Sequence, residues 1–105
     1  MSNGKVYLIG IPEDSRYKIG WTRGPINKRI APLQTGNPKK IEAIHLFETE
    51  HPIKVETWMH NRHGAKRMEG EWFQLTDDDV RNFKEDCQKG HDTFKMLIDS
   101  GNPFI

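Results

Sequence analysis

The sequence predicts a small domain of the α/β class, in its α+β form, and three observations lead to this fold class. The chain has 105 residues, which is enough for one domain and too few for two. Short runs of β-branched and aromatic residues alternate with stretches in which apolar residues recur at helical spacing. Turn residues separate these segments. We therefore assign residues 1–105 to a single domain.

Two strands are expected first. Residues 5–9 are rich in β-branched and aromatic side chains, and residues 11–15 supply turn chemistry after them. A second strand should follow at about residues 16–22. Because only a short turn separates the two strands, we expect them to form a hairpin.

A helix should come next, because Pro25 suits a first helical turn. Three apolar residues are spaced for one buried face of this helix: Ile26, Ile30 and Leu33. Pro32 removes a backbone hydrogen bond inside it and predicts a kink or an early end. Gly-Asn-Pro at residues 36–38 ends the helix in either case.

The following segments continue the alternation of strand and helix. Residues 41–47 alternate loosely and predict a third strand, and residues 53–63 predict a helix with an apolar stripe. Residues 64–70 form a basic loop. A short final strand is expected at residues 71–75.

Residues 76–105 predict a helical extension. Thr76 can cap a helix, with Asp79 at the capping-box position, and all three acids of residues 77–79 favour the positive end of a helix. Because capping accounts for these acids, we interpret them as structural rather than as a metal site. The remainder should form one broken helix or two short ones packed on the core.

Composition excludes several classes of protein. Only 34% of the residues are hydrophobic, and no apolar run is long enough to span a bilayer. No stretch near the N-terminus resembles a signal sequence, so we expect a cytoplasmic protein without a membrane partner. The single cysteine, Cys87, excludes an internal disulfide and argues against a cysteine-based zinc cluster. We expect its thiol to be buried or half-buried.

The charges are distributed unevenly. Residues 1–40 contain eight Lys and Arg against two acidic residues, a net charge of +6, whereas residues 71–105 contain four basic and eight acidic residues, a net charge of −4. A basic surface suits phosphate binding, because each neutralised phosphate releases counterions. An ordinary solvated face is the alternative. Six residues are candidate nucleic-acid contacts: Tyr17, Trp21, Arg23, Lys28, Lys39 and Lys40. Trp21 could stack a base, although tryptophans more often lie in the core.

Strand alternation sets Lys18 apart. Tyr17 and Ile19 must face the side of the sheet opposite to Lys18 and Gly20. If Tyr7 of the first strand shares the side of Lys18, a phenol and an ammonium approach each other closely. A nearby cation favours the phenolate form, which is a better proton acceptor at neutral pH.

Arg29 and Glu56 are further candidates. Arg29 lies at the edge of the first helix's apolar face, where a guanidinium could hold a phosphate with two parallel hydrogen bonds. Glu56 lies at the margin of the later helix's stripe and offers a carboxylate oxygen of the kind that Mg²⁺ prefers. Each has an ordinary alternative, since Tyr7 could be a core residue, Lys18 and Arg29 surface charges, and Glu56 half of a helix ion pair.

Two histidines, His60 and His63, lie on the same expected helix as Glu56. They could form a small metal site, or His60 could assist proton transfer. Their spacing lacks the tighter signature of histidine metal sites, which favours structural or solvent-facing roles.

Several motifs in order give a more specific signal than any single residue. They read KVYLIG from residue 5, YKIGWT from 17, NKRI from 27 with LQTGNP from 33, VETWMH from 55 and GEWF from 70. In this order and spacing the sequence resembles the GIY-YIG nuclease superfamily. It is closest to the small phage-associated branch whose second motif reads K-I-G. The resemblance covers residues 5–75, and residues 76–105 extend beyond this motif core.

The resemblance implies a three-stranded antiparallel sheet flanked by helices, with one Mg²⁺ or Mn²⁺ ion on one face. Tyr7 corresponds to the tyrosine of the first motif, and Lys18 stands where the second motif usually has its tyrosine. Arg29 corresponds to the arginine of the first helix, and Glu56 to the metal-binding glutamate. The implied reaction is phosphodiester hydrolysis in nucleic acid, expected to be DNA. In it, Tyr7, helped by Lys18, takes a proton from water and Arg29 holds the scissile phosphate.

The sequence departs from this pattern in places, and other functions stay open. The first motif reads K-V-Y and lacks its glycine, and Glu71 is a rival for the metal-binding role, although we prefer Glu56. One alternative is a non-catalytic nucleic-acid-binding module. Another is a protein-interaction domain, such as a phage-encoded inhibitor, for which the acidic C-terminal third would be the surface. Since the chain leaves room only for loops to choose a target, a partner protein could supply specificity.

Overall fold

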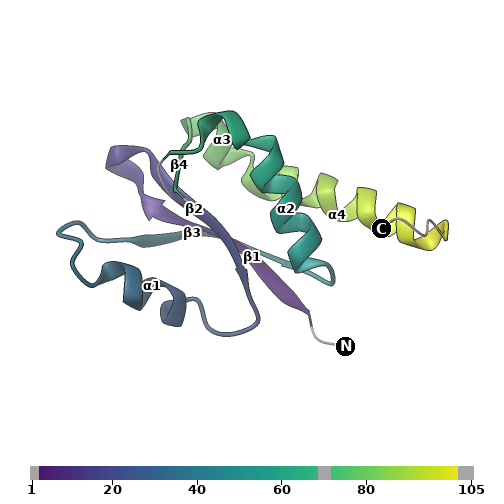
Figure 1. Cartoon of the computed structure of the whole chain (residues 1–105), viewed down its shortest axis with the longest axis horizontal. Coiled ribbons are helices and arrows are strands. Elements are labelled where there is room, and N and C mark those ends of the chain that lie inside the picture. The colour runs from purple at the N-terminus through teal and green to yellow at the C-terminus, as the bar shows by residue number, and fades with distance from the viewer. Residues whose placement is uncertain (1–2, 69–71, 102–105) are drawn as a thin grey trace.

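Four strands form one antiparallel sheet in the computed structural model, which describes residues 3–68 and 72–101 (Figure 1). Their order across the sheet is β3-β1-β2-β4. The strands are β1 (Gly4–Ile11), β2 (Arg16–Thr22), β3 (Glu42–Thr49) and β4 (Trp72–Gln74). The helices are α1 (Asn27–Gln34), α2 (Pro52–Arg62), α3 (Asp77–Arg81) and α4 (Phe83–Asp99), with short 3-10 helices η1 (Pro12–Asp14) and η2 (Gly64–Lys66).

The α+β class and the β1–β2 hairpin are confirmed, and one detail differs from the three-stranded sheet that the resemblance implied. The sheet has four strands instead of three because β4 adds to its edge. Phe73 of β4 pairs with Tyr17 of β2, and the two neighbouring residues of each strand pair as well. The sequence predicts a short strand here, but only the fold assigns it to the β2 edge.

The two faces of the sheet carry separate hydrophobic clusters. Alternation along β1 sends Val6 and Leu8 to one face and Tyr7, Ile9 and Ile11 to the other. The larger cluster includes residues of α2 and α4, and the smaller cluster packs against residues of α1. Helix α1 therefore lies on one side of the sheet, and α2, α3 and α4 lie on the other (Figure 1).

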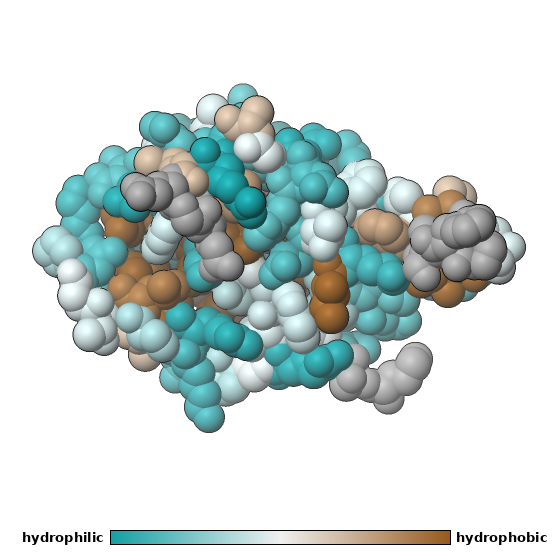
Figure 2. Space-filling view, in the orientation of Figure 1, coloured by the Kyte–Doolittle hydropathy of each residue, from teal (hydrophilic) through white to brown (hydrophobic). Residues whose placement is uncertain are grey.

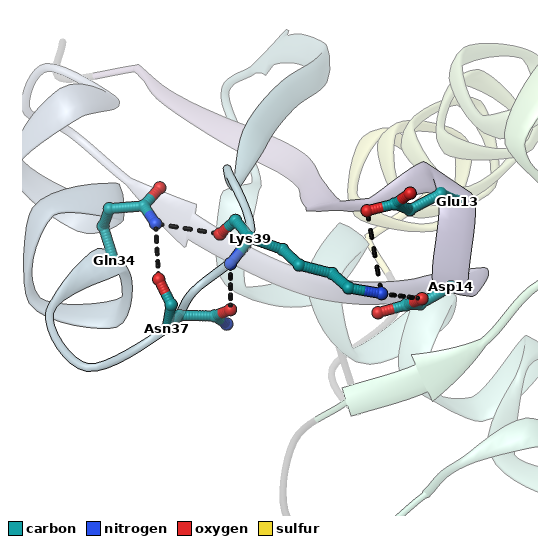
Figure 3. Close-up of polar contacts among 5 residues, drawn as sticks. All are labelled: Glu13, Asp14, Gln34, Asn37 and Lys39. Atoms are coloured by element: carbon teal, nitrogen blue, oxygen red, sulfur yellow. Dashed lines mark hydrogen bonds and ion pairs between the residues drawn. The ribbon is translucent and has the colours of Figure 1, made fainter.

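The expected helix at α1 continues past Pro32 and ends at Gln34. The Gln34 side chain then fixes the loop that follows (Figure 3). Its Nε2 donates to the backbone oxygens of Asn37 (3.2 Å) and Lys39 (2.9 Å). Its Oε1 accepts from the backbone nitrogen of Ile41 (2.8 Å). The Gln34 side chain thus satisfies backbone groups of the loop that have no partner in a helix or strand. The LQTGNP motif therefore has a structural role here.

The capping box is confirmed at the start of α3. Thr76 Oγ1 accepts from the Asp79 backbone nitrogen (3.1 Å), and the Asp79 carboxylate accepts from the Thr76 backbone nitrogen (3.0 Å). Lys66 also pairs with Asp79 at 2.6 Å. Burial alone would raise the pKa of Asp79, but the bonds from Lys66 and Thr76 outweigh burial and lower it.

The helical extension consists of two helices, α3 and α4, which are separated at Asn82. Two helices were one of the two arrangements that the sequence predicts. Phe83 and Cys87 bury the first half of α4 in the larger cluster. Burial raises the pKa of Cys87 to about 12, so its thiol stays protonated and serves packing. The end of α4 protrudes (Figure 1) and exposes Met96 and Ile98, and Figure 2 shows hydrophobic residues at this end as well as elsewhere on the same face. Within the described residues, no helix combines the length and apolar character needed to cross a membrane.

His63 follows α2 and is only 3% exposed. Among the described residues, its Nε2 atom has no hydrogen-bond partner. Burial lowers the pKa of His63; Asp79 and Asp86 oppose this shift, and Lys66 and Arg62 add to it. The folded protein therefore favours the neutral ring.

We expect the domain to lose stability as the pH falls below about 6.5, the pKa of an unperturbed histidine. Because the folded-state pKa of His63 is lowered, the unfolded chain binds more protons in this range, and acid favours unfolding. Urea unfolding of the wild type and His63→Leu at about pH 7.5 and about pH 5.5 checks this. The variant should lose less stability between the two pH values. An equal loss in both proteins would contradict the assignment.

Candidate active site

One pocket of about 260 Å³ brings together four side chains that the sequence analysis selected: Tyr7, Lys18, Arg29 and Glu56. They come from β1, β2, α1 and α2, so four elements contribute one side chain each. Four further residues complete the lining: Ile19, Gly20, Trp21 and His60. Polar groups that are far apart in the sequence therefore converge on one hollow, as in small-molecule and catalytic sites.

The pocket forms beside β2, where helices from both faces of the sheet reach this strand. On one side, the Arg29 Nε of α1 donates to Thr22 Oγ1 at 3.3 Å. On the other, His60 Nε2 of α2 lies 2.8 Å from the backbone oxygen of Ile19. These two side-chain bonds hold α1 and α2 against the same strand.

The register of the hairpin places Tyr7 opposite Gly20 and Ile9 opposite Lys18. Tyr7 and Lys18 therefore share one face of the sheet, as expected from strand alternation. The Tyr7 ring lies directly over Gly20, because a Cβ atom added there would lie 2.3 Å from the Tyr7 hydroxyl oxygen and 2.4 Å from its Cζ. Glycine in the K-I-G motif thus makes room for the phenol.

Thr22 orients Arg29 and was not singled out from the sequence. Its side chain is buried, and its Oγ1 accepts from both Arg29 Nε and the backbone nitrogen of Gly24, the latter at 3.0 Å. The bond engages Nε, and the two Nη groups of the guanidinium form the end-on fork that can grip a phosphate. A threonine at the end of a strand does not by itself indicate in the sequence that it orients an arginine.

Glu56 is half-buried on α2 and supplies a carboxylate to the pocket. Across residues 3–68 and 72–101, no group of three His, Cys, Asp or Glu side chains is arranged to hold a metal ion. A single carboxylate beside an open polar hollow fits Mg²⁺, which commonly takes one or two carboxylates and fills its shell with water and phosphate oxygens. The rival candidate, Glu71, lies outside the described residues.

His60 is held in one tautomer by its neighbours. The Ile19 carbonyl can only accept, so Nε2 carries the hydrogen, and Nδ1 is left to accept from the Arg67 guanidinium at 3.1 Å. Both ring nitrogens are thereby engaged, and the ring packs edge-on against Phe73. This arrangement suits a residue that anchors α2 beside Glu56 better than one that exchanges protons.

The candidate nucleic-acid contacts fall into different environments. Trp21, Arg23 and Lys28 line a second hollow of about 420 Å³, which shares Trp21 and Arg29 with the first. Lys40 is exposed in the loop before β3. Tyr17 is only 4% exposed and lies in the larger core cluster, on the opposite face. The Tyr17 ring therefore packs in the core and offers little surface for a nucleic-acid contact. Burial, followed by the charge of Asp77, raises the pKa of Tyr17.

Lys39 is engaged by carboxylates of η1 (Figure 3). Its ammonium lies 2.7 Å from Asp14 Oδ1 and 3.6 Å from Glu13 Oε1. The hydrogen bond to Asp14 raises the pKa of Lys39. The charge of this lysine is thus balanced within the protein, and its contribution to a phosphate-binding surface is reduced.

A protein-family model described as the T5orf172 domain matches residues 4–88 of the chain. The match begins in β1, ends in α4 and contains all four side chains of the pocket. The chain belongs to the T5orf172 domain family. This family is phage-associated and GIY-YIG-like, and it is related to nucleases. No curated protein and no solved structure shows a significant match to the chain.

In this T5orf172 domain, Gly20→Ala should destabilise the fold by roughly 1–3 kcal/mol, because the new methyl group overlaps the Tyr7 ring. The cost should largely disappear in a Tyr7→Ala background, where the methyl group has space. Urea unfolding of the wild type, both single variants and the double variant measures this coupling. If Gly20→Ala costs the same in both backgrounds, the contact with Tyr7 does not explain the glycine.

Proposed function

We propose that this T5orf172 domain is a metal-dependent endonuclease that hydrolyses phosphodiester bonds in nucleic acid, with DNA as the expected substrate. One observation carries the proposal: Tyr7, Lys18, Arg29 and Glu56, selected from the sequence, line a single pocket. Membership of a nuclease-related family supports the same class of activity.

Tyr7 is the proposed general base. Its hydroxyl lies over Gly20 at the pocket, and Lys18 lines the same hollow. A neighbouring ammonium favours the phenolate, which can take a proton from a water molecule. The water oxygen then forms a bond to phosphorus, the bond from phosphorus to the leaving sugar oxygen breaks, and the proton moves to Tyr7 Oη.

Arg29 is the proposed phosphate-binding residue. Thr22 fixes its guanidinium through Nε, so little reorganisation is needed when a phosphate arrives. Paired hydrogen bonds from a guanidinium stabilise the negative charge that builds up on the phosphate oxygens.

Glu56 is the proposed ligand of the metal ion, with Mg²⁺ or Mn²⁺ as the expected ion. Such an ion, when bound, supplies Lewis-acid stabilisation of the departing oxygen. His60, one turn further along α2, is hydrogen-bonded to the Ile19 carbonyl. This bond links the helix that carries Glu56 to β2. This second layer of support keeps the carboxylate at the pocket wall.

Replacing Glu56 by Gln should lower metal-dependent cleavage by about 100-fold or more, because the amide keeps the shape but loses the charge. The assay follows cutting of supercoiled plasmid and of single-stranded DNA with Mg²⁺ or Mn²⁺, at matched purity, and with a chelator as a blank. Glu48→Gln is the matched control, because Glu48 is exposed on the edge strand β3, which β1 separates from β2 and the pocket.

The outcomes separate the functions. Cleavage that falls in Glu56→Gln and persists in Glu48→Gln supports the proposal. Equal cleavage by wild type and Glu56→Gln would remove Glu56 from the mechanism. A wild type that cuts no substrate would overturn the catalytic proposal and leave the binding function described next.

Non-catalytic binding of nucleic acid is the second candidate. The hollow lined by Arg23, Lys28 and Arg29 favours it, because a binding module would use the same positive charge without needing Glu56. Salt-sensitive binding without cleavage would distinguish this function from the first.

A further inference from the structure

The hollow beside the catalytic pocket has no role in the reaction described above. It is lined by residues 21–25, Lys28 and Arg29, and has a volume of about 420 Å³. It adjoins the catalytic pocket, since Trp21 and Arg29 line both. Three cationic side chains line this flanking hollow, whereas no acidic residue does.

The positive charge of the flanking hollow is not balanced within the described part of the chain. Elsewhere in the described residues, cations such as Lys39, Arg62, Lys66 and Arg81 each pair with a carboxylate. For Arg23, Lys28 and Arg29, no such ion pair is found among residues 3–68 and 72–101. A concave surface with unbalanced positive charge concentrates anions.

Trp21 serves Arg23 in this hollow. The Arg23 Cζ atom lies over the indole, 5.0 Å from the ring centroid, which is the geometry of a cation–π contact. The same indole packs against the larger core cluster. Because Arg23 and the core both engage the ring, it is placed to hold a guanidinium rather than to stack a base.

The flanking hollow is also tied to the catalytic pocket. Thr22 Oγ1 accepts from the backbone nitrogen of Gly24, which lines the hollow, and from Arg29, which lines both sites. A single buried hydroxyl therefore fixes the turn and the shared arginine together. A ligand that spans both sites would meet cations held at a defined spacing.

We propose that the flanking hollow binds the backbone phosphate next to the scissile phosphate, and that Trp21 is the positioning residue for Arg23. This inference rests on the proposed function, because it takes a nucleic-acid strand as the ligand. Two neighbouring phosphates of the strand occupy the two adjoining sites, with Arg29 between them. The contact is to phosphate, so it contributes affinity and register without reading the base.

Binding in the absence of metal tests the inference. The probes are a labelled DNA duplex and a single strand of the same sequence, with anisotropy followed over a range of KCl in the presence of a chelator. Arg23→Gln should weaken binding by roughly threefold or more. It should also reduce the slope of log affinity against log salt by about 1. Lys95→Gln on α4 removes the same charge from an exposed position and serves as the control.

A double-variant cycle tests the role of Trp21. Trp21→Leu should weaken binding as much as Arg23→Gln, and the double variant should be no worse than either, since both changes remove one contact. Trp21→Phe keeps an aromatic face and should retain most of the affinity, which a general loss of folding would not allow. If Trp21→Leu weakens binding by the same factor in the Arg23→Gln background, Trp21 stacks a base and the positioning role is overturned.

Cleavage, measured separately, distinguishes this inference from the proposed function. If the wild type cuts DNA but Arg23→Gln behaves like Lys95→Gln in binding and in kcat/KM, only the flanking site is overturned. If the wild type binds DNA without cutting, and Arg23→Gln binds more weakly with a lower salt slope, the flanking site stands and catalysis fails. A wild type that binds neither probe overturns both.

Discussion

The antiparallel register between β1 and β2 is the constraint on which the candidate active site depends. It sets Tyr7 against Gly20, the only residue type that leaves space for the phenol at this position, and sets Lys18 on the same face. A shift of one residue would send Tyr7 to the opposite face of the sheet. The core enforces the register, because Val6 and Leu8 would then leave the larger cluster.

Two side-chain hydrogen bonds link helices α1 and α2 to the β2 strand of this hairpin. Thr22 bonds Arg29 of α1, and the Ile19 carbonyl bonds His60 of α2, so each helix contributes one anchor to β2. The anchors lie next to the residues that line the pocket, and they limit how far Arg29 and Glu56 can move. Such support is what holds catalytic groups close to a productive geometry.

The distribution of ion pairs divides the basic half of the chain into two parts. Lys39, in the loop after α1, is balanced by Glu13 and Asp14 (Figure 3). Arg23 and Lys28, in contrast, line a hollow without a carboxylate. Net charge from the sequence treats these residues alike. Their electrostatic roles differ because the acids beside Lys39 offset its positive charge and weaken its attraction for a phosphate.

Local patterns in the sequence determined the hairpin, the helices and the capping box of Thr76 and Asp79, because these depend on residues a few positions apart. Motif order also selected the four residues of the pocket. Only the tertiary structure decided that β4 pairs with β2, that Tyr17 is buried, and that both nitrogens of His60 are engaged. These features depend on partners brought together by packing, and a linear pattern does not specify which distant groups become neighbours.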